Sequence, residues 1–425
     1  MADKILYQIK KVLPAAFLSF WRPFYHYFLA LLAAVVYGFP SKKLKVIAVT
    51  GTKGKTSTVE IISAILEEAG YRTALAGTIR FKVGEYSENN IYKMTMPGRL
   101  FTQRFLKNAV RHKCDYAILE VTSQAAAQYR HKYISFDALV FTNLAPEHVE
   151  SHGSYENYVK AKLSVAEAVG KSKKPNRVIV SNADDKEGQK FLDYPVDKKL
   201  TYSLKDVEPY NIAKEGLNFT WHNQVITSYL SGIFNLSNIL AAATFAESQG
   251  VTDEIIKRAV EKFSGIRGRV EKIDEGQNFT VIIDYAHTPD SLQKLYEVFQ
   301  TSRIIGVLGN TGGGRDKWKR EEMANIAEKY CSNIILTNED PYDDDPCEIV
   351  EDMKKEITET ACEIIMDRRE AIARAFSLAQ EGDAVLITGK GTDPYIITKN
   401  YTKIPWNDAQ VAREELQKII NKNAG

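Results

Sequence analysis

The chain has 425 residues, and this length predicts two or three domains. Hydrophobic residues make up 44% of the sequence and charged residues 26%, which excludes wholesale disorder, collagen and coiled coil. Its 56 basic and 54 acidic residues leave a formal net charge of +2, so the composition does not indicate nucleic acid as a partner. Four scattered cysteines without CxxC spacing predict a reduced, cytoplasmic protein that lacks disulfides and structural zinc: Cys114, Cys331, Cys347 and Cys362.

The N-terminal segment, residues 1–44, is unusually apolar. Residues 28–37 carry no charge, but this run is shorter than the roughly 20 apolar residues that a membrane-spanning helix needs. Arg22, Pro23 and His26 separate it from the apolar residues at 17–21, and lysines flank the segment. We expect helix here, with two interpretations. One is a hairpin packed on the rest of the protein or on a partner subunit of an oligomer. The other is a peripheral contact of residues 5–38 with the inner face of a membrane.

From residue 45 onward, short apolar runs alternate with stretches of helical periodicity. The runs lie at 45–49, 117–121, 137–143, 177–181, 280–284, 303–308, 333–337 and 384–388. This alternation predicts an α/β fold with two mostly parallel sheets. We expect a central P-loop domain over residues 45–266 and a Rossmann-like C-terminal domain over residues 267–425. Residues 192–225 have weak periodicity, which predicts an antiparallel edge or loops.

The most specific local pattern is TGTKGKTS, between a predicted strand at 45–49 and a predicted helix at 59–69. A nucleotide phosphate and its Mg²⁺ need N–H groups at a helix start, a lysine and a hydroxyl group. The usual pattern G-x-x-x-x-G-K-[ST] is not fully met, because Val49 stands at the first glycine position. ATP is favoured over GTP because a guanine-reading N-K-x-D motif is missing; the alternative is a glycine-rich turn with a solvated lysine. The predicted ATP-binding loop comprises Thr50, Gly51, Thr52, Lys53, Gly54, Lys55, Thr56 and Ser57.

This loop resembles the phosphate loop of the Mur ligases, in which TGTNGKT is usual. Further motifs similar to that family follow in the same order: EVTS at 120–123, FTNL at 141–144, YVKAK at 158–162, GIFNLSN at 232–238, DYAHTPD at 284–290, DKWKR at 316–320 and TGKG at 388–391. DYAHTPD and the NADD at 182–185 look most like the UDP-N-acetylmuramoyl-tripeptide synthetases, the MurE type. The resemblance implies an ATP-dependent amide ligase of peptidoglycan synthesis. Such an enzyme activates a carboxylate as an acyl phosphate, from which an amino acid's amine displaces phosphate.

The resemblance also implies the catalytic residues. Similar enzymes use two Mg²⁺ ions, and Thr56 and Glu120 match the positions near the first ion. His148 and Lys162 match the ligands of the second, where the lysine is carbamylated by CO₂ and so becomes a carboxylate-like ligand. Taken alone, Lys162 is more often a solvated helix lysine and Glu120 a structural acid. The set implied by the resemblance is Lys55, Glu120, His148 and Lys162, with the neighbouring Lys160 out of register.

Several other positions match nucleotide contacts of the family. Asn235 and Asn238 resemble the asparagines near the adenine, although a helix N-cap is the alternative. Arg269, Asp284 and His287 open the C-terminal domain and are expected to reach the nucleotide when the domains close.

The acceptor positions depart from the family pattern. Typical members carry an N-terminal domain that holds the uridine nucleotide, whereas only the apolar segment precedes residue 45, so we expect no evident pocket for UDP. The family's Thr-Thr-Pro segment corresponds to residues 95–97, and Gln124 replaces a frequent histidine. The acceptor contacts implied by the resemblance are Thr95, Met96, Pro97, Ser123 and Arg130.

The amino-acid site departs as well. Residues 339–342 read EDPY where diaminopimelate-adding members often have DNPR, and the lost arginine removes a bidentate partner for a second carboxylate. Lysine or another amine is therefore favoured over diaminopimelate. Asp316 and Lys319 follow the glycine-rich turn at 312–314, a second phosphate-like loop or else a charged surface turn. The substrate contacts expected in the C-terminal domain are Asp316, Lys319, Asp340, Tyr342, Gly389 and Asp393.

Two alternatives stay open at this point. A related ligase could act on another acceptor, such as a lipid-linked muropeptide, a folate or an amino-acid polymer. A nucleotide-binding subunit of an amidating complex is the other alternative. Relatives of that kind often carry a cysteine cluster, and the four scattered cysteines here do not form one.

Overall fold

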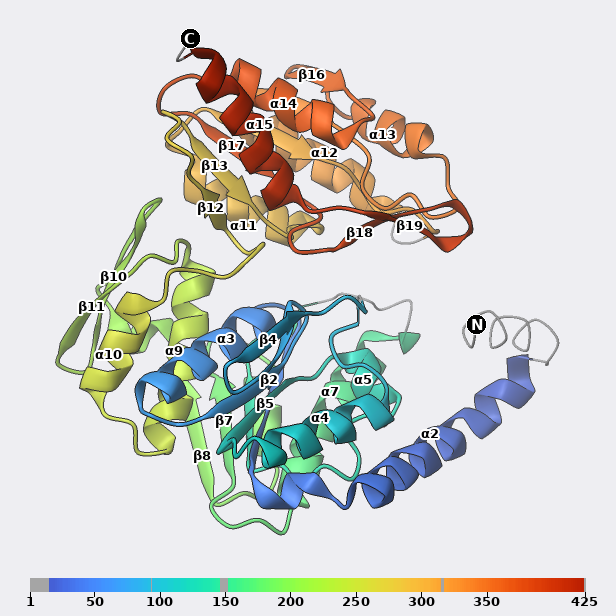
Figure 1. Cartoon of the computed structure of the whole chain (residues 1–425), viewed down its shortest axis with the longest axis vertical. Coiled ribbons are helices and arrows are strands. Elements are labelled where there is room, and N and C mark those ends of the chain that lie inside the picture. The colour runs from blue at the N-terminus through green and yellow to red at the C-terminus, as the bar shows by residue number, and fades with distance from the viewer. Residues whose placement is uncertain (1–14, 93, 146–151, 315–316, 424–425) are drawn as a thin grey trace. The chain divides into compact units, whose positions relative to one another are not determined.

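The computed structural model describes residues 15–92, 94–145, 152–314 and 317–423, with residues 15–23 described by their backbone alone (Figure 1). The chain divides into two compact units. The N-terminal unit comprises residues up to Tyr210, Phe219–Ile226 and Phe234–Phe263. The C-terminal unit comprises Asn211–Asn218, Thr227–Ile233 and the described residues from Ser264 onward. The domain limits 45–266 and 267–425 stay predictions.

An eight-stranded sheet forms the centre of the N-terminal unit, in the order β4-β3-β2-β5-β1-β6-β7-β8. Its strands are β1 (Lys45–Thr50), β2 (Thr73–Ala76), β3 (Arg80–Val83), β4 (Tyr86–Asn89), β5 (Tyr116–Glu120), β6 (Ala138–Phe141), β7 (Val178–Asn182) and β8 (Lys198–Tyr202). Six neighbouring strands of this sheet are parallel: β2, β5, β1, β6, β7 and β8. Strands β3 and β4 pair in antiparallel fashion at one edge. Strand β1 is central, and its register places Val49 opposite Glu120 and Thr50 opposite Phe141.

Helices cover this sheet because its central strands are apolar on both faces. Val46 and Ala48 point into a core that includes Leu106 of α4 and Val165 of α7. The helices are α3 (Lys55–Glu68), α4 (Arg99–Arg111), α5 (Ser123–Ala127), α7 (Tyr155–Gly170), α8 (Gly188–Leu192), α9 (Ile233–Ser248) and α10 (Asp253–Lys262), with the 3₁₀ helices η1 (Pro40–Lys43) and η2 (Leu204–Val207).

The apolar N-terminal segment contains one long helix, α2 (Ala15–Tyr37), which packs against α4 (Figure 1). Arg22, Pro23 and His26 interrupt the apolar run of the sequence but not the helix, which continues through Pro23. The two apolar runs at 17–21 and 28–37 thus belong to one continuous helix and form no hairpin with each other, and residues 1–14 lie outside the described residues. Within the described part of the chain, no helix is long and apolar enough to cross a bilayer.

Residues 192–225 contain strand β8 at the sheet edge and most of a small three-stranded sheet, ordered β11-β10-β9. Strand β10 (Gly216–Trp221) pairs in antiparallel fashion with β9 (Asn211–Ala213), and β11 (Gln224–Ser228) completes this sheet. The weak periodicity of this region therefore reflects short strands with exposed faces. The antiparallel prediction is confirmed for β9 and β10, whereas β8 pairs with β7 in parallel.

The C-terminal unit contains a six-stranded sheet in the order β12-β13-β17-β14-β15-β16. All its neighbours pair in parallel except β12 with β13. Alternate residues of the strands point to opposite faces of the sheet and pack into two hydrophobic cores, as the two-residue period of strands requires. Leu308 and Leu386 belong to one core, and Val307 and Val385 belong to the other. The two-sheet α/β expectation is thereby confirmed.

The strands of this unit are β12 (Glu271–Ile273), β13 (Thr280–Ile283), β14 (Ile304–Leu308), β15 (Asn333–Leu336), β16 (Ala361–Ile364) and β17 (Ala384–Ile387), with the hairpin β18 (Tyr395–Thr398) and β19 (Thr402–Pro405). Its helices are α11 (Pro289–Phe299), α12 (Trp318–Tyr330), α13 (Pro346–Lys354), α14 (Arg368–Leu378) and α15 (Asp408–Asn423), with the 3₁₀ helix η3 (Lys399–Tyr401).

Candidate active site

The TGTKGKTS loop joins the buried end of β1 to the start of α3, as the sequence predicts. Gly54 is the N-cap of α3, with a φ of 78° that residues with a Cβ rarely adopt. A Cβ at Gly54 would lie 2.2 Å from the Asn238 Oδ1, and one at Gly51 would lie 1.9 Å from the Thr142 Oγ1. Both glycines are therefore required by close packing, and no side chain caps the helix. The first N–H groups of α3 have no partner within the helix and point toward the space at its N-terminus, where an anion binds favourably.

The segment that follows β6 holds this loop in place. The Thr52 and Lys53 amides donate to the Asn143 carbonyl and to its Oδ1, at 2.7 and 2.9 Å. In return, the Thr142 hydroxyl donates to the Lys53 carbonyl at 2.6 Å. Because β6 is the neighbour of β1 in the sheet, these residues arrive at the loop directly. Hydrogen bonds with the residues that follow β6 thus hold the phosphate loop in its conformation.

The Lys55 ammonium group lies inside the curve of the loop, where it donates to the Thr52 carbonyl at 2.8 Å. The Thr52 hydroxyl is 2.7 Å from the Tyr158 hydroxyl of α7, so a second helix also supports the loop. A lysine at this point neutralises phosphate charge in other glycine-rich phosphate loops. The phosphate-binding role of Lys55 stays a prediction.

Glu120 ends β5, next to β1, and is nearly fully buried. Its carboxylate accepts from the Thr56 hydroxyl at 3.1 and 3.2 Å, from the Thr78 amide at 2.8 Å and from the Thr78 hydroxyl at 3.0 Å. One carboxylate and two hydroxyl oxygens at the mouth of a phosphate loop fit the coordination that Mg²⁺ prefers, since this ion usually takes one or two carboxylates, water and phosphate oxygens. Within the described ranges, no cluster of three His, Cys, Asp or Glu residues could hold a metal by itself.

Lys162 is buried, with 2% of its surface exposed, although it lies on a helix whose neighbouring Lys160 is exposed. Its ammonium group donates to the Gly51 carbonyl at 2.5 Å and lies 4.8 Å from the centre of the Tyr158 ring. Lys162 therefore sits against the phosphate loop and is no solvated surface lysine. The other predicted ligand of the second ion, His148, lies outside the described residues.

Asn235 and Asn238 lie inside α9, and both are buried. The Asn238 amide donates to the Asn235 Oδ1 at 3.3 Å, and its Oδ1 accepts from the Thr58 hydroxyl at 3.5 Å. Since α9 begins at Ile233, neither residue is an N-cap. Asn238 lies against the first turn of α3, next to Gly54, and Asn235 contacts it from the same helix.

The segment with Thr95, Met96 and Pro97 connects to the carboxylate site. The Thr95 hydroxyl is 2.8 Å from that of Thr78, which in turn contacts Glu120. Arg130 donates to the Met96 carbonyl, and its partial burial, together with nearby Arg99, lowers the Arg130 pKa to about 10. Arg130 thus fixes the backbone of this segment.

Ser123, the remaining predicted contact of the acceptor substrate, is the first residue of α5 and lies three residues after Glu120. Its hydroxyl is 3.1 Å from the His152 Nε2, and the His152 ring contacts Tyr158 with 5.4 Å between the ring centres. Ser123 is therefore next to the loop-supporting residues, whereas Gln124 is exposed.

Three predicted nucleotide contacts gather in the C-terminal unit around Tyr285. The Arg269 guanidinium lies 4.3 Å from the Tyr285 ring centre, and the His287 Nδ1 is 2.8 Å from the Tyr285 carbonyl. Asp284 accepts from the Val270 and Ala286 amides, both at 2.7 Å. Burial raises the Asp284 pKa, although Arg269 opposes this effect.

The EDPY segment of this unit contains two buried acids. Asp340 accepts from the Lys390 ammonium at 2.8 Å and from the Ile397 amide at 2.7 Å. Glu339 accepts from the Thr311 hydroxyl at 2.8 Å, and burial, followed by the charge of Asp340, raises the Glu339 pKa. The Asp340 carboxylate is thus already bound by two groups of the protein itself.

The other predicted substrate contacts lie near this pair or outside it. Gly389 packs closely against Glu339, since a Cβ at Gly389 would lie 2.4 Å from the Glu339 Oε2. Asp393 lies 3.6 Å from the Lys390 ammonium. Tyr342 adopts a left-handed φ of 55°, and its amide donates to the Ile397 carbonyl at 3.0 Å. Lys319 is nearly buried on α12, and Asp316 lies outside the described residues.

Thr78, Asn143 and Tyr158 were not singled out as functional from the sequence. Thr78 and Asn143 each come within two residues of the end of a parallel strand, β2 or β6. Polar residues after parallel strands collect at one edge of a sheet, and this position was the available signal. Tyr158 carried no such signal, because its role depends on how α7 packs against the loop.

The parallel sheet, the glycine-rich loop and the lysine, threonine and carboxylate beside it define a phosphate-binding α/β protein of the P-loop kind. Comparison with known proteins narrows this class. The sequence profile of the Mur ligase middle domain matches residues 49–246, and that of the Mur ligase glutamate ligase domain matches residues 268–391. The chain belongs to the Mur ligase family of ATP-dependent, ADP-forming ligases.

Two relatives cover most of the chain. It is 39% identical to the UDP-N-acetylmuramoyl-L-alanyl-D-glutamate–2,6-diaminopimelate ligase of Syntrophomonas wolfei, over 92% of this chain and 81% of that protein. It is 37% identical to the UDP-N-acetylmuramyl-tripeptide synthetase of a Roseiflexus species, over 92% and 82%. The predicted MurE-type resemblance is confirmed.

Solved structures agree with this assignment. A UDP-N-acetylmuramoyl-L-alanyl-D-glutamate–2,6-diaminopimelate ligase superposes with a TM-score of 0.62 at 29% identity, over 89% of this chain and 79% of that one. A folylpolyglutamate synthase of Mycobacterium tuberculosis superposes with a TM-score of 0.67 at 17% identity, over 86% and 92%. The second likeness concerns the fold alone.

Proposed function

We propose that this protein is a MurE-type ligase that joins an amino acid to the carboxylate of a muramoyl-peptide acceptor in peptidoglycan synthesis. The observation that carries the proposal is the convergence of Lys55, Thr56, Glu120 and Lys162 on one phosphate loop. The names of the two relatives above describe the same kind of acceptor. We infer a cytoplasmic reaction, because ATP is available there.

The first step joins the γ-phosphoryl group to an acceptor oxygen. The bond between Pγ and the ADP oxygen breaks, and a new bond forms between Pγ and the acceptor carboxylate. Two anions must approach each other, so positive charge and N–H groups dominate the catalysis. The α3 N-terminus and Lys55 would hold the β- and γ-phosphates, and Asn238, which lies next to Gly54, would be near the nucleotide together with Asn235. Thr56 and Glu120 would hold a Mg²⁺ ion, which supplies charge neutralisation at the phosphates.

In the second step the amine attacks the acyl carbon. The bond between that carbon and the phosphate-bearing oxygen breaks, phosphate leaves with the electron pair, and the amine nitrogen loses a proton. An acyl phosphate hydrolyses readily, so exclusion of water favours the amide product. The residues around Thr95 and Arg130 are the proposed acceptor contacts, because they connect to Glu120 through Thr78.

We further propose that Lys162 is carbamylated. The neutral amine would attack CO₂, forming a nitrogen–carbon bond and releasing one proton, so that a buried cation becomes an anion with two oxygen ligands. Burial of Lys162 against the loop, in contrast to exposed Lys160, supports this assignment. His148 is the proposed second ligand by family position.

The amino acid is proposed to be lysine or another amine without a second carboxylate to be clamped. Tyr342 stands where diaminopimelate-adding members often have an arginine, so the bidentate partner of a second carboxylate is missing, and Asp340 already accepts from Lys390. The relatives named as diaminopimelate ligases make diaminopimelate the substrate to test against lysine.

The decisive experiment is a product mass. The full chain is incubated with ATP, Mg²⁺, one amino acid at a time and a panel of UDP-linked and lipid-linked muramoyl dipeptides. We expect ADP, phosphate and a product heavier by one amino-acid residue. ATP hydrolysis without an amide product across the whole panel would contradict the proposal and favour a subunit of an amidating complex.

Lys162→Ala tests the carbamate, with Lys160→Ala as the matched control on the same helix. We expect the Lys162 variant to lose ligase activity by about 100-fold or more, because a preorganised charge is removed at the phosphate site. Added short-chain carboxylic acids should restore part of it, since they can occupy the place of the carbamate. An equally inactive Lys160→Ala, with no rescue of Lys162→Ala, would refute the assignment.

A further inference from the structure

Helix α2 exposes an apolar stripe along the side that faces away from the protein. From residue 24 to its end the helix carries no Asp, Glu, Lys or Arg. The stripe, which we call the α2 stripe, consists of Phe24, Phe28, Leu32, Val35 and Val36, with exposed fractions of 42% to 63%. These positions recur every three or four residues, so they lie on one face of the helix. An exposed apolar surface of this extent marks an interaction site.

The opposite side of α2 is fixed to the N-terminal unit. Ala30, Ala33 and Ala34 are fully buried, and the Tyr27 ring contacts the Tyr133 ring with 5.2 Å between their centres. Small residues allow α2 to approach α4 closely (Figure 1). The helix is therefore held in place while its stripe remains exposed.

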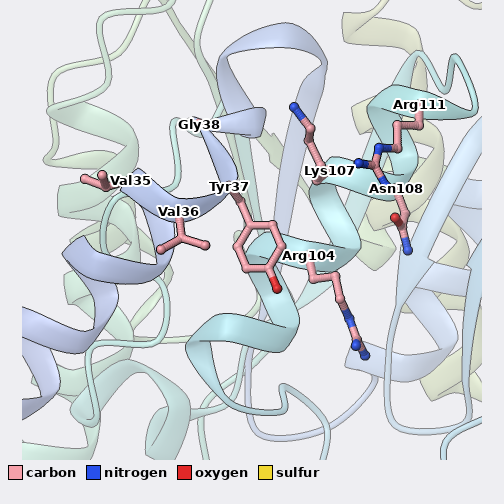
Figure 2. A pocket seen from close by; sticks show the side chains of 8 residues that line it. All are labelled: Val35, Val36, Tyr37, Gly38, Arg104, Lys107, Asn108 and Arg111. Carbon is pink, nitrogen blue, oxygen red and sulfur yellow. The ribbon is translucent and has the colours of Figure 1, made fainter.

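A cationic pocket adjoins the C-terminal end of the stripe. It has a volume of about 340 Å³ and lies between the end of α2 and one face of α4. Figure 2 shows Val35 and Val36 on one side of Tyr37, and Arg104, Lys107 and Arg111 on the other. The three cations are spaced three and four residues apart, so they share one face of α4. Among the described residues, no carboxylate forms an ion pair with any of them.

We propose that the α2 stripe and the cationic pocket together dock the protein on the surface of an anionic bilayer. In this arrangement α2 lies in the plane of the interface with its stripe among the acyl chains, and the pocket receives the phosphate of an anionic phospholipid. A charge-free apolar helix face beside basic side chains is the pattern of interfacial helices, which bind anionic lipid through both surfaces. The exposed Tyr25 suits the headgroup level.

Charge decides between a bilayer and a second copy of the chain as the occupant. A symmetric dimer through this face would bring three cations of one copy near three of the other, with no carboxylate beside them in the described part. Like charges at such an interface are unfavourable. An anionic bilayer supplies the opposite charge and an apolar layer at once.

Vesicle sedimentation of the full chain tests the docking without reference to ligase activity, so its outcome is separate from that of the proposed function. We expect binding to phosphatidylglycerol-containing vesicles, weak binding to pure phosphatidylcholine, and loss of binding at high salt. The triple variant Arg104→Gln, Lys107→Gln and Arg111→Gln should weaken partitioning by about 100-fold. The variant Phe28→Ser, Leu32→Ser and Val36→Ser should weaken it by about 10-fold or more.

A matched control removes three exposed lysines elsewhere on the same unit, Lys173→Gln, Lys199→Gln and Lys205→Gln. This control should bind vesicles like the unaltered chain. An equal loss in the control and the pocket variant would overturn the proposal, because it would show unspecific charge attraction. Failure of the unaltered chain to bind anionic vesicles, or a dimer in light scattering that the stripe variant dissociates, would overturn it as well.

Discussion

Two glycine-rich turns follow parallel strands in this protein, and they differ in what surrounds them. The turn after β1 ends in the first residue of α3, and its glycines press against the Thr142 and Asn238 side chains. The turn at 312–314 follows β14, and two of its amides donate hydrogen bonds to neighbouring residues. The Gly312 amide donates to the Asp340 carbonyl at 2.8 Å, and the Gly314 amide donates to the Asp344 carboxylate at 3.3 Å.

The charges beside the two turns differ too. Lys55 and Lys162 approach the first turn, whereas the buried acids Glu339 and Asp340 lie beside the second. Glycine after a strand therefore does not by itself make a phosphate site. The first turn is distinguished by the start of a helix, whose first N–H groups have no partner within that helix, and by two lysines that donate to carbonyl groups of the turn itself. The second turn closes on an acidic segment in which Asp340 is paired with Lys390.

Alanine at one glycine of each turn gives the sharpest test of this contrast. Gly54 and Gly314 have similar φ values, 78° and 70°, so each Gly→Ala change should cost about 1 kcal/mol of backbone strain. A Cβ at Gly54 also meets Asn238, whereas one at Gly314 meets nothing within 4 Å. We expect Gly54→Ala to lower ligase kcat/KM by about 100-fold, because the loop must shift. Gly314→Ala should stay close to the unaltered activity.

The measurements are steady-state kinetics and ATP binding by calorimetry, with urea unfolding to compare stability. Equal activity losses for the two variants would contradict the proposed difference between the turns, since they would indicate that both turns bind phosphate.

The ionic pair beside the second turn should matter for stability. Lys390 and Asp340 are both buried, and Lys390→Met leaves a carboxylate without its cation. Loss of one partner of a buried pair typically costs 3–5 kcal/mol, so we expect about 3 kcal/mol less free energy of unfolding in urea. The double variant Lys390→Met and Asp340→Asn should recover part of this loss, because the more deeply buried of the two carboxylates beside Lys390 is then uncharged and only Asp393 lacks its cation. A single variant of unaltered stability would show that the pair is not structural.

The smallest expected effect concerns the pH dependence of stability. Burial and the charge of Asp340 raise the pKa of Glu339, so the folded protein holds this proton at pH values where the unfolded chain has released it. Its contribution to the free energy of unfolding should therefore decrease as the pH rises from the ordinary glutamate value through the raised one. Glu339→Gln should make this part of the profile flatter in urea titrations between pH 4.5 and 7.5. A slope unchanged by the substitution would contradict the role of this carboxyl group.

The sequence was sufficient for the elements that depend on local patterns. The loop at 50–57, the alternating strands and the position of Glu120 after a strand all follow from spacing, and the family resemblance added Lys162. Contacts set by tertiary packing were out of reach. Thr78 contacts Glu120 across 42 residues and Lys390 contacts Asp340 across 50, and these pairings depend on strand order. Helix α2 also continues through Pro23, although a proline usually ends a helix. Packing against α4 stabilises the part of α2 that follows Pro23.

Helix α4 connects the segment at residues 95–97 with the cationic pocket. It begins at Arg99, just after the segment with Thr95 and Pro97, and ends at Arg111 in the cationic pocket. Its 13 residues span about 20 Å at 1.5 Å per residue. The segment at residues 95–97 and the cationic pocket are therefore joined by one helix of about this length. On the proposed bilayer contact, a lipid-anchored acceptor would have to reach no farther than about 20 Å from the pocket, whereas a freely diffusing one is under no such limit.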